Sequence, residues 1–377
     1  MSEDEGAGVP IIDLSLADDD LVEQIAEACS TWGFFQLTNH GFPPDLVDEF
    51  RSQMKEFFSL PHDLKICLKR DENNARGFFD DELTKRRRDW KEAIDVGVPG
   101  SRDWSVPDDD ASNECLDGFN RFPAESDAPK FRPTVVRYFQ ACESLADRIA
   151  VLMGKGLGRG GNIETEKQKD TFFQELRTKH TSYLRMNYYP VCPSTMHSRP
   201  DDKPPPLGIS PHKDAGFLTV LVQDDDCHSL QVARYPNGDE SMKPRWVTVH
   251  PHPGSFTINT GDMAQIWSNG KYKAPLHRVL TNDAKVRYSA PFFYNPGYRT
   301  EIAPFLAQKP RYNPCSWGYF RAVRFAGDLT DLGIEIQISD FEKEAESPHI
   351  EKQARFTCEV DCCSRFSVEK FRPLAEV

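Results

Sequence analysis

The sequence contains no apolar run close to the ~18 residues that a membrane-spanning helix needs. It begins Met1-Ser2-Glu3-Asp4-Glu5, which lacks the basic and apolar regions of a secretory signal. Basic residues are also in deficit, because 46 Lys and Arg face 59 Asp and Glu and give a formal net charge of −13. These absences predict a cytoplasmic protein whose partners include neither nucleic acid nor a membrane. A local arginine can still bind an anionic small molecule.

The sequence patterns of zinc proteins are missing as well. It contains no Cys-x-x-Cys pair and no His-Glu-x-x-His motif. Its ten cysteines lack the dense, regular spacing of a disulfide scaffold. We therefore interpret them as free thiols, including Cys358, Cys362 and Cys363 near the C-terminus.

Two histidines and one aspartate form the candidate metal site. His212 and Asp214 are two residues apart, and side chains at that spacing on a β-strand point to the same face. His277 lies in an apolar/polar alternation that follows a proline, which is typical of a second strand. Two imidazoles and a carboxylate on one face of Fe(II) leave the other face open for substrate and O2. We therefore predict that these three residues bind a catalytic metal.

An arginine and a serine follow the second histidine. Arg287 and Ser289 are again two residues apart, so they would share one face of a strand. A guanidinium group can bind a carboxylate through two hydrogen bonds, and a neighbouring hydroxyl can donate a third. This pair predicts a binding site for a carboxylate.

Hydrophobic periodicity divides the chain into a helical half and a β-rich half. In the first half, apolar residues recur every three or four positions, as in amphipathic helices. The glycine-rich run 154–161 is expected to end the last of these helices, and 158–169 is expected to be a loop. Between about 183 and 293, short alternating runs separated by turn residues predict a sandwich or barrel. The elements predicted for the first half are helices over about 21–32, 46–57 and 136–152 and a strand over 33–38.

This pattern suggests four segments. We expect a disordered leader over residues 1–8, a helical and mixed region over 9–175, a catalytic β core over 176–305, and a C-terminal helical region and tail over 306–377.

Short motifs in a fixed order connect the two halves. With the metal and arginine motifs, they make the chain resemble the 2-oxoglutarate-dependent Fe(II) dioxygenases of the isopenicillin-N-synthase-like group. The resemblance covers roughly residues 9 to 340. The motifs are Val9-Pro10-Ile11-Ile12-Asp13-Leu14, Trp32-Gly33-Phe34-Phe35, Asn39-His40-Gly41, Leu184-Arg185-Met186-Asn187-Tyr188-Tyr189-Pro190, Asn259-Thr260-Gly261-Asp262 and Trp267-Ser268-Asn269-Gly270.

The resemblance implies a mainly β fold with flanking helices, built on a double-stranded β-helix (a cupin-like jelly roll). It implies an oxidoreductase that uses Fe(II), 2-oxoglutarate and O2, with ascorbate as a candidate reductant. By the same resemblance, Arg287 and Ser289 bind the far carboxylate of 2-oxoglutarate, and Tyr189 and Asn187 also contact this cosubstrate. The expected reaction hydroxylates or desaturates a small organic metabolite and releases succinate and CO2.

The substrate is only weakly indicated. Relatives use positions just after the arginine motif, which makes Phe293 and Asn295 candidates for the pocket wall, and Phe78 is a third candidate. These aromatic residues favour an apolar or ring-bearing substrate, although core packing explains them equally well. We expect a monomer or a weak homo-oligomer.

Two other functions fit the same motifs. One is an Fe(II) oxidase of the same fold that does not use 2-oxoglutarate, because the arginine motif binds other carboxylates in that branch. The other is a jelly-roll protein that binds or senses a ligand without turnover, although an intact set of His212, Asp214 and His277 argues against it.

Overall fold

The computed structural model describes residues 8–84, 87–158, 163–193, 206–305, 309–329 and 336–359. Most of the predicted leader lies outside these ranges, as do Cys362 and Cys363. None of the described helices is both long enough and apolar enough to cross a membrane.

Within the described residues, the core is a large eight-stranded sheet that faces a smaller four-stranded one. The strand order in the large sheet is β1-β2-β12-β9-β14-β7-β6-β3, and that in the small sheet is β11-β10-β13-β8. Only the β1–β2 pair is parallel among the described pairs of these two sheets. The large sheet consists of β1 (Ile11–Asp13), β2 (Phe34–Thr38), β3 (Gly77–Phe79), β6 (Glu92–Gly97), β7 (Tyr183–Tyr189), β9 (Leu218–Gln223), β12 (Phe256–Thr260) and β14 (Arg287–Tyr294). The small sheet consists of β8 (Leu207–His212), β10 (Leu230–Arg234), β11 (Arg245–Thr248) and β13 (His277–Leu280).

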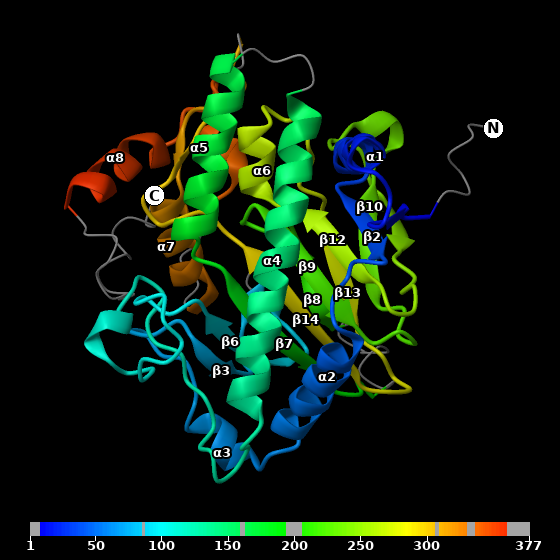
Figure 1. The fold of residues 1–377 in the computed structure, drawn as a ribbon, viewed down its shortest axis with the longest axis vertical. Helices are drawn as coiled ribbons and strands as arrows, with labels where there is room; N and C mark the ends of the chain where they lie inside the picture. The colour runs from blue at the N-terminus through cyan, green and yellow to red at the C-terminus, as the bar shows by residue number, and fades with distance from the viewer. Residues whose placement is uncertain are drawn as a thin grey trace, which may run out of the picture.

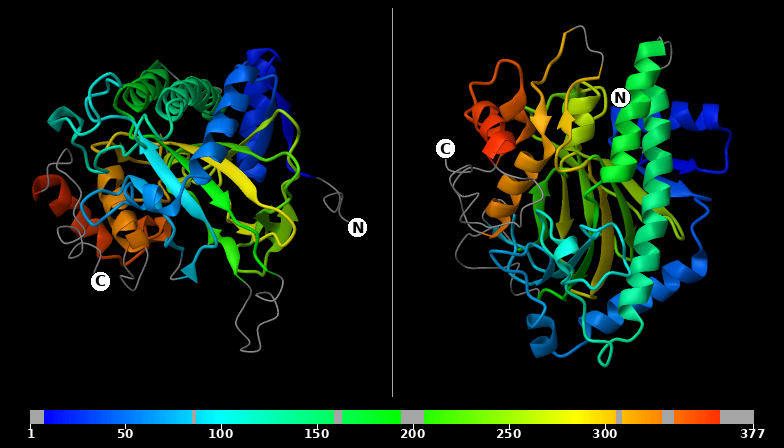
Figure 2. Two further views of the ribbon diagram at one scale, coloured as in Figure 1. Left: turned by 90° about the horizontal axis from the view of Figure 1, so that it is seen from below. Right: turned by 60° about the vertical axis from the view of Figure 1, so that its left-hand side comes forward.

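Helices cover the large sheet on the side away from the small sheet. The long helix α4 crosses this face, and Figure 2 shows α4 and α5 on one side of the sheets and α7 on the other (Figures 1 and 2). The helices are α1 (Asp18–Thr31), α2 (Pro44–Phe58), α3 (His62–Ile66), α4 (Phe131–Leu157), α5 (Ile163–Lys179), α6 (Asp262–Trp267), α7 (Trp317–Leu329) and α8 (His349–Glu359). Short 3-10 turns occur at Ala111–Asn113, Pro236–Gly238 and Ile338–Phe341. Two small two-stranded sheets are formed by β4 (Leu83–Thr84) with β5 (Arg87–Arg88) and by β15 (Glu301–Ile302) with β16 (Cys315–Ser316).

The two faces of the large sheet carry different residue types, because side chains alternate along each strand. On β14, Ala290, Phe292 and Tyr294 are buried in the core against the helices, and the Phe292 ring lies 5.0 Å from that of Phe139 on α4. The residues of β14 in the opposite phase, including Arg287 and Ser289, face the small sheet. We call the side of the large sheet that packs against the helices the helix face, and the side toward the small sheet the metal face.

The predicted fold class is confirmed: the chain is mainly β with flanking helices around a jelly-roll core. The predicted helices correspond to α1, α2 and α4, and the predicted strand over 33–38 is β2. The large sheet takes β1, β2, β3 and β6 from the segment N-terminal to residue 176, so both halves of the chain build it.

The predicted loop over 158–169 is wrong for its second part. Helix α4 continues through Gly154 to Leu157, and α5 starts at Ile163. A side chain at Gly154 would collide with the ring of Phe173 on α5, so the glycine permits close packing of the two helices. Tertiary packing thus overrides the weak helical signal of this polar segment.

Candidate active site

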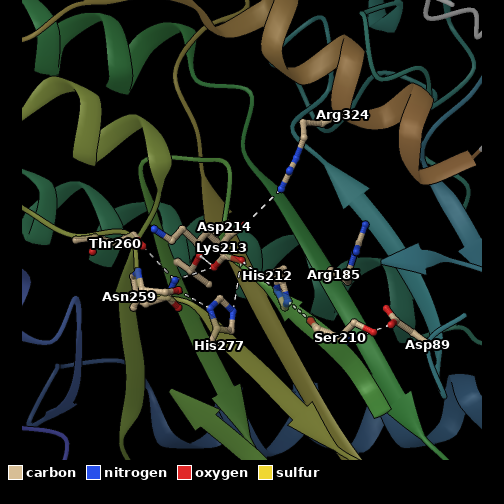
Figure 3. A network of polar contacts seen from close by, with 12 residues as sticks. Asp89, Arg185, Ser210, His212, Lys213, Asp214, Asn259, Thr260, His277 and Arg324 are labelled. Carbon is tan, nitrogen blue, oxygen red and sulfur yellow. Dashed lines mark hydrogen bonds and ion pairs between the residues drawn. The ribbon is translucent and has the colours of Figure 1, made fainter. Parts of the chain in front are cut away.

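The three predicted metal ligands converge between the two sheets (Figure 3). His212 ends β8 and His277 begins β13, and the two residues are direct partners on adjacent antiparallel strands. Asp214 follows β8, and its Oδ1 lies 3.6 Å from Nε2 of each histidine. The candidate ligand atoms all lie within 4.8 Å of one another, and no other such group of three occurs among the described residues. This arrangement fits one metal ion bound from one side.

The backbone orients both imidazoles in the same way. Nδ1 of His212 lies 2.8 Å from the carbonyl oxygen of Ser210, and Nδ1 of His277 lies 3.0 Å from that of Pro275. A carbonyl only accepts, so each Nδ1 carries the proton and each Nε2 keeps its lone pair for a metal. The ring of Phe34 on β2 packs edge-on against His277, at 5.5 Å between centroids.

Asp214 is held so that one carboxylate oxygen remains available. Its Oδ2 accepts hydrogen bonds from Thr219 Oγ1 at 2.6 Å and from Asn259 Nδ2 at 2.7 Å. Burial raises the pKa of the Asp214 carboxyl, but the adjacent histidines and these two hydrogen bonds outweigh it, so the pKa lies below its usual value. The carboxylate is therefore ionised at neutral pH, with Oδ1 directed at the histidines.

The imidazole of His212 is also in the protonation state that a metal requires. Burial and the neighbouring His277 lower its pKa from 6.5 to about 3, against the opposing attraction of Asp214. The ring is neutral at physiological pH and can act as a ligand.

A second polar cluster lies on the metal face of the large sheet. Arg287 pairs with Tyr189 on β7, and Ser289 pairs with Asn187, so the four predicted cosubstrate residues share one patch of the sheet. The Arg287 guanidinium lies over the Tyr189 ring at 4.8 Å and donates from Nη1 to Ser289 Oγ at 3.2 Å. Its Nη2 donates to Gln223 Oε1 on β9 at 2.8 Å.

This cluster is short of negative charge. Arg287 is only 2% exposed, yet no carboxylate pairs with it among the residues that the structure describes. Arg287 Nε, Gln223 Nε2 and Asn187 Oδ1 are buried without a hydrogen-bond partner in the described part of the chain. A buried cation with no counter-charge is costly, so the site fits an anionic ligand that brings a carboxylate.

Comparisons with known proteins agree with this geometry. A model of the 2OG-Fe(II) oxygenase superfamily matches residues 180–296, and a model of the non-haem dioxygenase N-terminal region named for morphine synthesis matches 9–125. Jasmonate-induced oxygenase 2 of Arabidopsis thaliana is 34% identical over 351 residues, covering 88% of this chain and 83% of that protein. The chain belongs to the 2OG-Fe(II) oxygenase superfamily. Homoarginine-6-hydroxylase 2-ODD-C23 of Glycine max is 31% identical over 329 residues, covering 81% of this chain and 91% of that protein.

Solved structures of this superfamily have the same fold. A crystal structure of JOX2 in complex with 2OG, Fe and JA aligns with a TM-score of 0.65 at 31% identity, covering 84% of each chain. A full-length Neurospora crassa protein in complex with alpha-KG and thymine aligns with a TM-score of 0.69 at 23% identity, which shows the fold alone, over 86% of this chain and 98% of that chain.

This superfamily member is a 2-oxoglutarate-dependent dioxygenase, and its cofactors are Fe(II) and 2-oxoglutarate. That conclusion disfavours both alternatives, the oxidase that does not use 2-oxoglutarate and the protein without turnover. The histidine–aspartate group suits Fe(II), and the guanidinium of Arg287, which has no carboxylate partner among the described residues, suits the cosubstrate.

The three predicted substrate residues lie in different places. Phe293 is half-buried on the metal face, beside Thr219 in the sheet, and stacks on Tyr183 at 4.7 Å. Asn295 is buried, and neither polar atom of its side chain has a hydrogen-bond partner among the described residues. Its amide lies against Gly216, two residues after Asp214.

Phe78 lies away from the site. It is fully buried on the helix face of β3, 6.5 Å from the ring of Phe57 on α2. Its neighbour Phe79 occupies the metal face instead, where it pairs with Ala93 and lies against the Arg185 guanidinium at 4.8 Å. Phe78 therefore packs the core, and the position of an aromatic residue on the metal face belongs to Phe79.

Sequence reasoning missed three supporting residues: Thr219, Asn259 and Gln223. Asn259 lies within a motif that supports the family resemblance, but the motif alone does not indicate its role. Thr219 and Gln223 are four residues apart on β9, so they share the metal face, but only the pairing with β12 and β14 brings them to Asp214 and Arg287.

Proposed function

We propose that this dioxygenase hydroxylates or desaturates a small organic metabolite and converts 2-oxoglutarate to succinate and CO2. In this proposal His212, Asp214 and His277 bind the iron. Arg287 and Ser289 donate hydrogen bonds to the far carboxylate of 2-oxoglutarate. When bound, Fe(II) and 2-oxoglutarate would activate O2 for attack on a C–H bond of the substrate.

The observation that carries the proposal is the buried Arg287, which has no carboxylate partner among the described residues and lies on the sheet face opposite the ligand strands. Tyr189 and Asn187 flank it from β7 and would contact the same cosubstrate. Their burial would keep water from the carboxylate and strengthen each hydrogen bond to it.

The substrate belongs to the proposal only by class. The stacked pair Phe293 and Tyr183 gives the metal face an apolar surface that suits a ring-bearing compound. Gibberellin 2-beta-dioxygenase 8, codeine O-demethylase and homoarginine-6-hydroxylase 2-ODD-C23 are all 30–31% identical to this chain, so the proposal extends to small organic metabolites as a class. A cytoplasmic location and a monomeric or weakly associated state remain part of the proposal.

An anaerobic titration of the Fe(II)-loaded protein with 2-oxoglutarate tests the cosubstrate site. Chelation gives a visible metal-to-ligand charge-transfer band, which we expect to saturate. Arg287→Ala should weaken 2-oxoglutarate binding by roughly 10- to 100-fold, because charge-assisted hydrogen bonds contribute about 1.5–3 kcal/mol each. Fe(II) binding should be nearly unchanged. If both affinities fell equally, Arg287 would be structural. A screen for substrate-dependent succinate release would then identify the metabolite.

A further inference from the structure

The strand that carries His212 lies at an open edge of the small sheet. Among the described strands β8 pairs with β13 alone; the short strand β4 lies close to β8 but is not paired with it, so one row of the backbone groups of β8 has no hydrogen-bonded strand. Such an edge is a weak place from which to hold a metal ligand, because half of its hydrogen bonds must come from elsewhere.

Residues 89–91 cover this edge. The Trp90 N–H donates to the carbonyl oxygen of Leu207 at 2.9 Å, near the start of β8. Further along the strand, the Ser210 N–H donates to Oδ1 of Asp89 at 3.2 Å (Figure 3). The segment thus replaces a neighbouring strand, with a carboxylate at the point closest to His212.

A buried ionic network fixes the carboxylate of Asp89. Its Oδ2 lies 3.2 Å from Lys91 Nζ, which lies 2.6 Å from Glu82 Oε2. Glu82 in turn pairs with Arg185 on β7 at 2.9 Å, and Arg185 pairs with Asp95 on β6 at 2.8 Å. The side chains of Asp89 and Lys91 are only 1% and 2% exposed, so solvent does not screen these pairs. The network connects β8 to the large sheet.

Ser210 transmits this restraint to the metal site. Its N–H is bound by Asp89, while its carbonyl oxygen accepts from Nδ1 of His212 at 2.8 Å. His277 has no comparable need, because β13 is paired on both sides, with β8 and with β10.

We propose that Asp89 is a positioning residue for the metal site: it fixes the backbone of Ser210 and thereby the orientation of the His212 imidazole. This inference rests on the proposed function in one respect, the role of His212 as a metal ligand. It adds a residue more than 120 positions away in the sequence to the requirements for iron binding.

The test is the affinity of the metal-free protein for Co(II), whose visible absorption reports ligand number and geometry, measured together with thermal melting. Asp89→Ala should weaken Co(II) binding roughly 10-fold, the low end of the cost of losing an outer-sphere partner of a metal-bound histidine, because Asp89 acts on His212 through the Ser210 backbone. Asp89→Asn keeps a neutral acceptor for the Ser210 N–H and should lose only roughly twofold. If Asp89→Ala does not fold, the Co(II) affinity of Asp89→Asn decides whether Asp89 positions His212.

Two matched variants separate positioning from stability. Lys91→Met breaks the same buried ion pair but leaves the Asp89–Ser210 hydrogen bond, so it should lower the melting temperature with little loss of Co(II) affinity. Asp81→Ala removes an exposed pair with Lys69 in the same region and should change neither. Equal Co(II) losses in Asp89→Ala and Lys91→Met, or no loss in Asp89→Ala, would overturn the inference. If His277→Ala bound Co(II) as the wild type does, the proposed metal site itself would be refuted.

Discussion

Gln223→Glu is the most informative single change at the cosubstrate site. It replaces the amide oxygen that accepts from Arg287 Nη2 at 2.8 Å with a carboxylate oxygen of the same size. The fold should tolerate it, because the buried guanidinium gains the counter-charge that it lacks among the described residues. The same carboxylate would then neutralise the positive charge of Arg287 to which the far carboxylate of 2-oxoglutarate must bind.

The magnitude follows from the geometry. Two unit charges about 4 Å apart attract by roughly 4 kcal/mol at an effective dielectric constant of about 20. Burying the new carboxylate cancels part of this attraction, which leaves about 1.5–3 kcal/mol. The expected loss of 2-oxoglutarate affinity is therefore roughly 10- to 100-fold. The melting temperature of the cosubstrate-free protein should stay level or rise.

The assay is the anaerobic charge-transfer titration at constant Fe(II), with Gln223→Met as the control of similar size without charge. The control should lose less affinity than Gln223→Glu, since it removes one neutral hydrogen bond and adds no competing carboxylate. Wild-type affinity in Gln223→Glu would refute the argument that Arg287 lacks a counter-charge until the cosubstrate binds.

Two further predictions concern the metal ligands. His277→Ala should abolish Fe(II)-dependent turnover and leave the circular dichroism spectrum intact; retained oxygenase activity would contradict the ligand assignment. In the metal-free protein, the pKa of His212 is lowered from 6.5 to about 3, so the unfolded chain binds the proton more readily. Its contribution to stability is complete above pH 6.5 and is lost as the pH falls toward 3. Calorimetry should show a melting temperature that falls as the pH is lowered over this range, and that falls less steeply with pH in His212→Gln. Equal dependence on pH in the two proteins would contradict the lowered pKa of His212.

The candidate metal ligands and the arginine motif could be predicted because they depend on local spacing. Residues two apart on a strand share a face whatever the rest of the fold, so His212 with Asp214 and Arg287 with Ser289 followed from the sequence. His277, the proposed third ligand, was placed by the expectation of a second strand together with the resemblance to the dioxygenase family.

The parts that failed depend on register and tertiary packing. The phase of β3, a strand of three residues, could not be read from Phe78-Phe79, and the choice fell on the residue that faces the helices. Gln223 reaches Arg287 only because β9 pairs with β14, which is a contact over 64 positions. Helix α5 is too polar to be recognised without its partner α4.

The two faces of β14 bear on how such an enzyme can acquire new substrates during evolution. Ala290, Phe292 and Tyr294 hold the sheet to the helices, whereas Phe293 lies between them in the sequence and belongs to the metal face of the sheet. In its proposed role at the pocket wall, a substitution at Phe293 would reshape the active site while the core against the helices stays unchanged. Substrate choice and folding could then evolve through adjacent codons, with little interference between the two.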